Sequence, residues 1–108
     1  MISQIKQLLG FGPKIDLQEL INQGAILLDV RSKAEFQGGH IKNSMNIPVD
    51  QLKSNLKKLP KKEMPIITCC ASGMRSAAAK SMLKQAGYNQ VHNGGSWRSL
   101  TYLEIPFK

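Results

Sequence analysis

Two short apolar runs constrain the fold of this chain more than any other feature. AILLDV occupies residues 25–30 and PIITC occupies residues 65–69. Continuous runs of this length, rich in branched side chains, are typical of parallel strands that are covered on both faces. The rest of the chain must therefore supply helices for both sides of a sheet.

Capping patterns predict where those helices begin. Asp16 with Glu19, and Ser32 with Glu35, have the spacing of capping boxes. The predicted helices cover 17–23, 33–36, 50–60 and 76–86. Further short strands are predicted at Ile15, 44–48 and 90–92. Strands that alternate with helices in this way predict an α/β fold with a small, mostly parallel five-stranded sheet.

The length and composition are typical of one soluble domain. The chain has 108 residues, which is about the modal size of a domain. We expect residues 1–108 to form one unit, with a short helix in residues 1–12 packed on it. No apolar run approaches the roughly 18 residues that a membrane helix needs, and residues 1–12 lack the pattern of a secretion signal. We therefore expect a cytoplasmic monomer that does not bind a membrane.

A dense group of lysines raises the question of nucleic-acid binding. The formal net charge is +8, and five lysines lie within residues 53–62. Leu52, Leu56 and Leu59 recur at helical spacing through the same segment, so we expect the lysines to decorate the solvated face of an amphipathic helix. No platform of arginines and aromatic rings accompanies them, so nucleic acid is not an expected partner. A positive field still concentrates small anionic substrates near the protein.

The chemistry of the chain is expected at its only two cysteines, Cys69 and Cys70. Adjacent Cα atoms lie about 3.8 Å apart, which is short of the roughly 4.4–6.8 Å that a relaxed disulfide spans. Neither His40 nor His92 has a metal-ligand spacing to the thiols. We therefore expect no structural disulfide, no metal site and no cofactor, which leaves either reactive thiol chemistry or an inert pair.

The loop after the cysteines is suited to hold an anion. Successive N–H groups that lead from a strand into a helix form an anion cradle, and Gly73 can supply the positive φ that curls it. Lowering a thiol pKa by about two units corresponds to roughly 2.7 kcal/mol. A helix dipole supplies at most about 2 kcal/mol, so we expect loop amides and Arg75 to supply the rest. A sulfur activated in this way can attack a sulfur donor and then carry the transferred atom as a persulfide.

Several motifs in order resemble those of the single-domain rhodanese-like sulfurtransferases, over nearly the whole chain. DVRSKAEFQGGHIKNSMNIP (29–48) is similar to the family's DVR, E-aromatic, GHI and NIP series, and CASGMRS (70–76) is similar to its CxxGxRS active loop. Gly94-Gly95 followed by Trp97 resembles the family's GG-then-W ending. The resemblance implies a three-layer α/β/α domain. It also implies transfer of sulfane sulfur from an anionic donor (thiosulfate, polysulfide or persulfide) to a thiol or to cyanide.

The same resemblance implies a role for each residue of the loop. Cys70 corresponds to the cysteine that forms the persulfide. Arg75 would bind an anionic donor or brace the loop, and Ser76 would cap the following helix. Asp29 and Arg31, which match the DVR pair, would support the site through local backbone or contact the substrate. The backbone expected to surround the sulfur belongs to Ala71, Ser72, Gly73, Met74, Arg75 and Ser76.

Two alternative functions fit the same residues. Counted from Cys69, Arg75 has the cysteine-to-arginine spacing of thiol phosphatases and related arsenate reductases, whose longer loop admits a tetrahedral anion. The position of Gly73 and the DVR and GHI elements favour Cys70, and Cys69 is then an inert thiol at the end of a buried strand. The other alternative is a non-catalytic rhodanese-like interaction module, against which the intact Cys70 argues.

The charge distribution suggests what kind of protein accepts the sulfur. A small domain with an exposed loop and a lysine-rich helix suits an acidic thiol carrier, because opposite charges steer two proteins together. A thioredoxin-like protein is the partner that we expect on this ground. The donor would be a small sulfur-containing anion.

Overall fold

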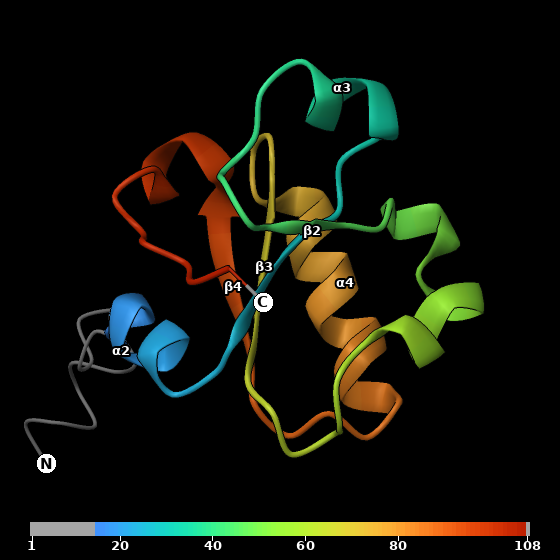
Figure 1. The fold of residues 1–108 in the computed structure, drawn as a ribbon. Helices are drawn as coiled ribbons and strands as arrows, with labels where there is room; N and C mark the ends of the chain where they lie inside the picture. Colours follow the sequence, from blue (N-terminus) through green and yellow to red (C-terminus); the bar gives the residue numbers. More distant parts are fainter. Residues whose placement is uncertain (1–14, 108) are drawn as a thin grey trace, which may run out of the picture.

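The computed structural model describes residues 15–107 of the chain and contains a parallel sheet of four strands (Figure 1). The order across the sheet is β2-β1-β3-β4, and all three pairings are parallel. The strands are β1 (Ile26–Asp29), β2 (Met45–Asn46), β3 (Ile66–Cys70) and β4 (Val91–Ser96). The predicted α/β class is confirmed, but the prediction of five strands is wrong for the described residues. Ile15 lies outside any strand, and its side chain is 54 % exposed.

Helices connect the strands and cover the sheet. The α-helices are α2 (Leu17–Asn22), α3 (Lys33–Gln37) and α4 (Met74–Gln85), and the 3₁₀-helices are η1 (Val49–Gln51), η2 (Lys53–Lys58) and η3 (Trp97–Leu100). Ser32 and Glu35 form the predicted capping box at the start of α3, and the Asp16 side chain accepts a hydrogen bond from the Glu19 N–H at the start of α2. The helix expected in residues 1–12 lies outside the described residues.

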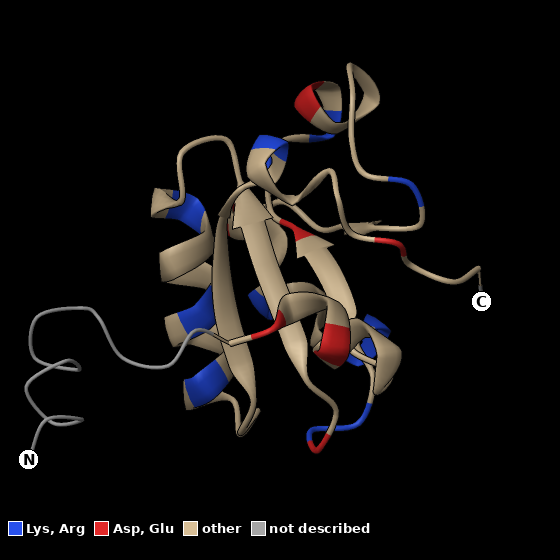
Figure 2. Ribbon diagram, turned by 90° about the vertical axis from the view of Figure 1, so that its left-hand side faces the viewer, with Lys and Arg blue, Asp and Glu red and all other residues tan. Residues whose placement is uncertain are grey.

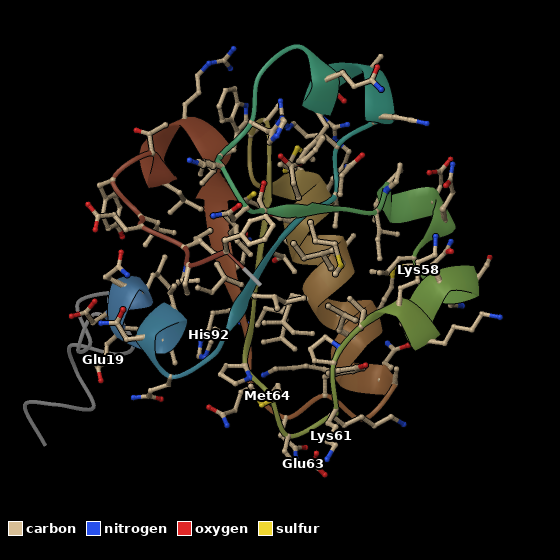
Figure 3. All side chains as sticks on the ribbon, in the orientation of Figure 1. Glu19, Lys58, Lys61, Glu63, Met64 and His92 are labelled. Carbon is tan, nitrogen blue, oxygen red and sulfur yellow. The ribbon has the colours of Figure 1, made fainter. Side chains whose placement is uncertain are left out.

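The lysine-rich segment differs from the single α-helix that the sequence predicted. It forms η1 and η2, and Asn55 interrupts η2 with φ −124° and ψ 21°. Leu52 and Leu59 are nevertheless buried, as the helical spacing indicated. The lysines of the segment are exposed, and Lys58 and Lys61 lie on the outside of the molecule (Figure 3). Basic residues also recur along the outer side of α4 (Figure 2).

Two apolar cores, one on each face of the sheet, confirm the three-layer arrangement. Successive side chains of a strand point to opposite faces, so Ile66 packs in one core and Ile67 in the other. The first core joins the sheet to α4, η1 and η2 through Leu52, Leu59, Ala79 and Leu83. The second joins it to α2 and the C-terminal segment through Ile21, Leu100 and Leu103.

The carboxyl ends of the strands meet at one edge of the sheet, at the top of Figure 1. The loop after β3 lies there, next to α3 and η3. No helix of residues 15–107 has the length and apolar character required to cross a membrane.

Candidate active site

The candidate site is the loop between β3 and α4. β3 ends at Cys70 and α4 begins at Met74, so three residues form the turn. Gly73 has a φ of +101°, which confirms the prediction that this glycine curls the loop. Its Cα also lies beside Gly95, because a Cβ added at Gly73 would be 3.5 Å from the Gly95 Cα. Met74 is 79 % exposed at the rim of the loop.

The Cys70 sulfur lies inside this loop and accepts two backbone hydrogen bonds. The amide nitrogens of Gly73 and Ser76 lie 2.9 and 3.4 Å from Sγ. The Ser76 hydroxyl oxygen is 3.6 Å from the same sulfur. Cys70 has no exposed surface, so a reagent reaches the sulfur only when loop residues move aside.

Burial and hydrogen bonding act in opposite directions on the pKa of Cys70. Removal from water is the largest single influence, and it raises the pKa because it penalises the thiolate. Hydrogen bonds from the Ser76 hydroxyl and from the N–H groups of Ser76, Gly73 and Ser72 favour the thiolate. Together they outweigh burial, so the pKa of Cys70 lies below its ordinary value.

Ser76 does not cap α4, which corrects the role that the resemblance implied. The helix begins two residues earlier, at Met74, and its N-cap is Gly73 without a side-chain hydrogen bond. Ser76 is instead fully buried beneath the loop, and Thr68 of β3 donates its hydroxyl hydrogen to the Ser76 carbonyl oxygen at 2.9 Å. Ser76 therefore acts on the sulfur rather than on the end of the helix.

Asn93 of β4 is a site residue that the sequence analysis missed. Its Oδ1 lies 2.6 Å from the Ser76 hydroxyl oxygen and accepts a hydrogen bond from the Gly95 N–H at 2.9 Å. Its Nδ2 lies 3.3 Å from the Gly73 carbonyl oxygen. The available signal was a polar side chain directly after the short strand predicted at 90–92 and directly before the glycine pair.

Arg75 is engaged by an acidic side chain. Its Nη1 and Nη2 donate to Oε1 and Oε2 of Glu35 at 2.7 and 3.0 Å, which is a bidentate pair. The hydrogen bond from Arg75 is the main reason that the pKa of Glu35 falls from 4.5 to about 2. The resemblance implied that Arg75 either binds an anionic donor or braces the loop. The observed pairing favours the brace, because it ties the start of α4 to α3.

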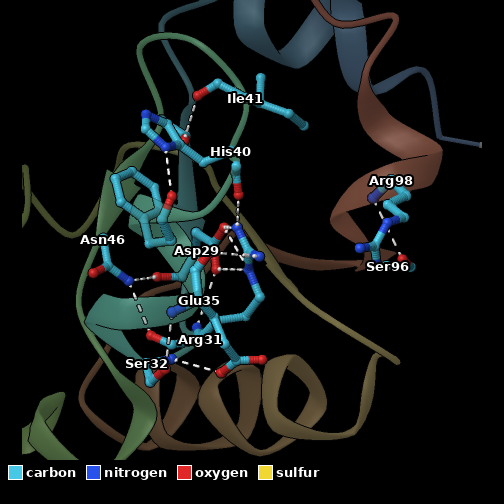
Figure 4. A network of polar contacts seen from close by, with 12 residues as sticks. Asp29, Arg31, Ser32, Glu35, His40, Ile41, Asn46, Ser96 and Arg98 are labelled. Carbon is cyan, nitrogen blue, oxygen red and sulfur yellow. Dashed lines mark hydrogen bonds and ion pairs between the residues drawn. The ribbon is translucent and has the colours of Figure 1, made fainter.

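Asp29 and Arg31 form a buried ion pair at the carboxyl end of β1 (Figure 4). Arg31 Nη2 lies 2.7 Å from Asp29 Oδ2, and it also donates to the Gly39 carbonyl oxygen at 2.8 Å. Asn46 donates to the carbonyl oxygens of both residues, at 2.9 and 3.0 Å. These contacts join the end of β1 to the segment after α3 and to β2. They are those expected if Asp29 and Arg31 support the site through local backbone, rather than by contact with the substrate.

A recess of about 230 Å³ adjoins the loop at Ala71. Trp97 forms one wall, with the guanidinium carbons of Arg31 and Arg98 at 4.4 and 5.1 Å from its ring centre. Arg98 is exposed and forms no ion pair with any described residue. The recess is therefore flanked by a guanidinium that lies over the Trp97 ring and has no carboxylate partner among the described residues.

Cys69 lies on the other face of the sheet. It packs with Ile67 and Leu100 in the second core, whereas Cys70 belongs to the first. Burial, followed by the charge of Asp29, raises the pKa of Cys69 from 9.0 to about 12. A phosphatase mechanism through Cys69 and Arg75 is not supported by this geometry. Residues 15–107 also contain no group of three or more potential metal ligands.

Comparison with known proteins agrees with the architecture of this site. The sequence model of the rhodanese-like domain family matches residues 14–98. The chain belongs to the rhodanese-like domain family. Among curated relatives, the thiosulfate sulfurtransferase PspE of Escherichia coli is 30% identical over 79 residues, which cover 72% of this chain and 76% of PspE.

Solved structures of rhodanese-like proteins superpose on this domain. A rhodanese-related protein of Thermoplasma volcanium is 38% identical with a TM-score of 0.68, over 84% of this chain and 89% of that one. The human single-domain sulfurtransferase TSTD1 is 31% identical with a TM-score of 0.68, over 82% of this chain and 91% of TSTD1.

Some relatives are longer than the matched region. This rhodanese-like domain is 36% identical to the Bacillus subtilis protein YqhL over 64% of its own length, and it covers 54% of YqhL. It covers 21% of a tRNA uridine(34) hydroxylase of Enterobacter, to which it is 32% identical over 62% of its own length.

Proposed function

We propose that this rhodanese-like domain is a sulfurtransferase that carries sulfane sulfur on Cys70. The observation that carries the proposal is the sulfur held by the Gly73 and Ser76 amides at 2.9 and 3.4 Å. These donors favour a negative charge on the sulfur, whether it is a thiolate or a persulfide anion. PspE, named a thiosulfate sulfurtransferase, supports the choice of reaction class.

The reaction is a transfer of one sulfur atom in two displacements. In the first, the Cys70 thiolate attacks the outer sulfur of thiosulfate, the S–S bond breaks, and sulfite leaves with the bonding electron pair. The product is a Cys70 persulfide anion beside the same amides. In the second, a thiolate or cyanide attacks the outer sulfur of the persulfide and regenerates the Cys70 thiolate. Neither step needs a metal, a redox cofactor or a histidine base.

The surroundings of the loop favour an anionic donor and an acidic acceptor. Arg98, which has no ion-pair partner among residues 15–107, lies at the recess beside Ala71, and exposed lysines occur on η2 and at Lys84 of α4. We propose a thioredoxin-like protein as the thiol acceptor on this basis of charge. Pull-down with the η2 lysines changed to glutamine tests this partner, and unchanged capture would refute it.

Intact-mass measurement tests the central proposal. After incubation with thiosulfate or polysulfide, the wild-type protein and Cys69→Ala should each gain one sulfur atom that dithiothreitol removes. Cys70→Ala should gain none. A persulfide on Cys70→Ala, or hydrolysis of an aryl phosphate by the wild type, would contradict the proposal.

A further inference from the structure

The amide of Asn93 has an orientation that its neighbours fix. Its Oδ1 lies 2.9 Å from the Gly95 amide nitrogen, which can only donate. The opposite end of the amide, Nδ2, lies 3.3 Å from the Gly73 carbonyl oxygen, which can only accept. A flipped amide would lose both hydrogen bonds, so the oxygen of Asn93 is the atom that faces Ser76.

This orientation determines where the single hydroxyl proton of Ser76 lies. The Ser76 oxygen is 2.6 Å from Asn93 Oδ1 and 3.0 Å from the Gly73 carbonyl oxygen, and both are acceptors. With the shorter contact to Asn93, the hydroxyl donates there, and its lone pair faces Cys70 Sγ at 3.6 Å. A protonated Cys70 can therefore donate to Ser76, which in turn donates to Asn93.

The direction of this chain must reverse when Cys70 loses its proton. A thiolate, or a persulfide anion, has no proton to give and requires donors. Among residues 15–107, the Ser76 hydroxyl is the side-chain donor within reach of the sulfur, and it can turn to the sulfur only by leaving Asn93. Asn93 Oδ1 then keeps the hydrogen bond from Gly95 and is not left without a partner.

We propose that Asn93 is a positioning residue that acts on Cys70 through Ser76, holding the serine hydroxyl while Cys70 is a thiol and releasing it to the sulfur anion. The inference rests on the proposed role of Cys70 as the nucleophile. The release of the Ser76 hydroxyl requires an uncharged acceptor such as the Asn93 amide. A carboxylate at this position would accept a hydrogen bond about twice as strongly and would retain the hydroxyl.

The charged and titratable groups near Cys70 do not take the place of Asn93 in positioning the Ser76 hydroxyl. Arg75 on α4 is paired with Glu35 on α3, and Asp29 at the end of β1 is paired with Arg31. His92, the neighbour of Asn93 on β4, pairs in register with Ile67, whose side chain packs on the opposite face from Cys70. Asn93 is exposed on an edge strand, so its replacement leaves both cores intact.

The test is a double-mutant cycle in the pH dependence of alkylation. Wild type, Asn93→Asp, Ser76→Ala and the double variant react with iodoacetamide from pH 5 to 10, and mass spectrometry follows Cys70. The midpoint of each profile reports the pKa of the thiol, and the plateau at high pH reports access through the loop. Asn89→Asp, at another exposed asparagine, adds the same charge away from Ser76 and serves as the control.

Asn93→Asp should raise the midpoint by about one pH unit, and this increase should fall by at least half in the Ser76→Ala background. Asn89→Asp should leave the midpoint unchanged. An equal increase in both backgrounds would mean that the new charge acts directly on the sulfur, and it would overturn the proposal. An unchanged midpoint in Asn93→Asp would also overturn it.

A second variant covers the case in which the aspartate prevents folding. Asn93→Ala, combined with Ser76→Ala in the same cycle, should change the midpoint non-additively, and additive changes would refute the coupling. Iodoacetamide supplies no sulfur atom. A failure of the wild type to form a persulfide would therefore count against the proposed function and leave this cycle interpretable.

Discussion

Cys69 and Cys70 are neighbours in the chain, yet the fold gives the two thiols different surroundings and shifts their pKa values in opposite directions. Both are buried at the end of β3. Cys69 packs among apolar side chains on one face, where its pKa rises to about 12. Cys70 points to the other face, beneath amides that lower its pKa. Burial alone therefore does not set the pKa of a thiol, because hydrogen-bond donors that contact the sulfur inside the protein can outweigh it.

The difference follows from two elementary properties of the backbone. Alternation along a strand sends adjacent side chains to opposite faces. The left-handed Gly73 then turns the chain back over one of those faces only. A relaxed disulfide between two side chains placed in this way would require the strand to distort, so we expect that the second thiol does not resolve oxidation products of the first.

The largest expected effect is the contrast between the two alanine variants. Cys70→Ala should lower sulfur transfer from thiosulfate to cyanide by at least about a thousandfold, because it removes the nucleophile. Cys69→Ala should change the rate by less than about twofold and the free energy of unfolding by about 1 kcal/mol. Thiocyanate formation and urea unfolding measure the two quantities. A large loss of rate in Cys69→Ala, with its fold intact, would remove the distinction between the thiols.

The next effect concerns the hydroxyl beneath the sulfur. Ser76→Ala removes a donor that favours the Cys70 thiolate, so the pKa of Cys70 should rise and the rate at neutral pH should fall by about tenfold. The sign is definite, since the rate depends on the thiolate and is lost as the pH falls through the pKa of Cys70. The loss should therefore be recovered at higher pH. A pH-independent loss in steady-state kinetics would mean that Ser76 has a structural role only.

A smaller effect concerns the brace between α3 and α4. The pKa of Glu35 is lowered to about 2, mainly by the hydrogen bond from Arg75. This pairing stabilises the fold above pH 4.5, the ordinary value, and the contribution is lost as the pH falls through about 2. Both side chains are 38 % exposed, so solvent screening limits the contribution to less than about 1 kcal/mol.

Acid unfolding of Glu35→Gln checks this estimate. The variant should lack part of the pH dependence of stability below pH 4.5, the ordinary pKa of this carboxyl. Glu63→Gln, at an exposed glutamate without an ion pair to any described residue, is the matched control. The brace contributes nothing measurable if both variants retain the wild-type profile.

The smallest effect tests the recess beside Ala71. Arg98→Gln should lower kcat/KM for 3-mercaptopropionate by about two- to fivefold, the range of an exposed ion pair. The variant should leave kcat/KM unchanged for 2-mercaptoethanol, a neutral acceptor of similar size. Lys33→Gln, at an exposed lysine outside this recess, controls for the loss of net charge. Equal losses for both thiols would mean that Arg98 does not meet the acceptor.

Much of this architecture could be predicted from local patterns. The apolar runs identified β1 and β3, the capping spacing of Ser32 and Glu35 identified α3, and the glycine loop identified the edge that carries Cys70. These features depend on residues close together in the sequence. The same is true of the left-handed turn at Gly73.

The errors concern contacts that no local pattern encodes. The role of Ser76 was mistaken because a hydroxyl near a helix start suggests a cap, whereas here α4 begins earlier and turns that side chain inward. Asn93 was missed because it reaches Ser76 only through the pairing of β3 with β4. Asn55 breaks the lysine-rich helix in spite of its regular leucine spacing.

Residue-resolved alkylation of the wild-type protein at pH 7 tests the central distinction most directly. Limiting iodoacetamide is added to the folded protein, and peptide mass spectrometry separates the label on Cys69 from the label on Cys70. The label should accumulate on Cys70 at least about tenfold faster, since each pKa unit between two thiols changes the thiolate fraction by up to that factor. Equal labelling of the two thiols, or faster labelling of Cys69, would contradict the claim that Cys70 is the activated thiol.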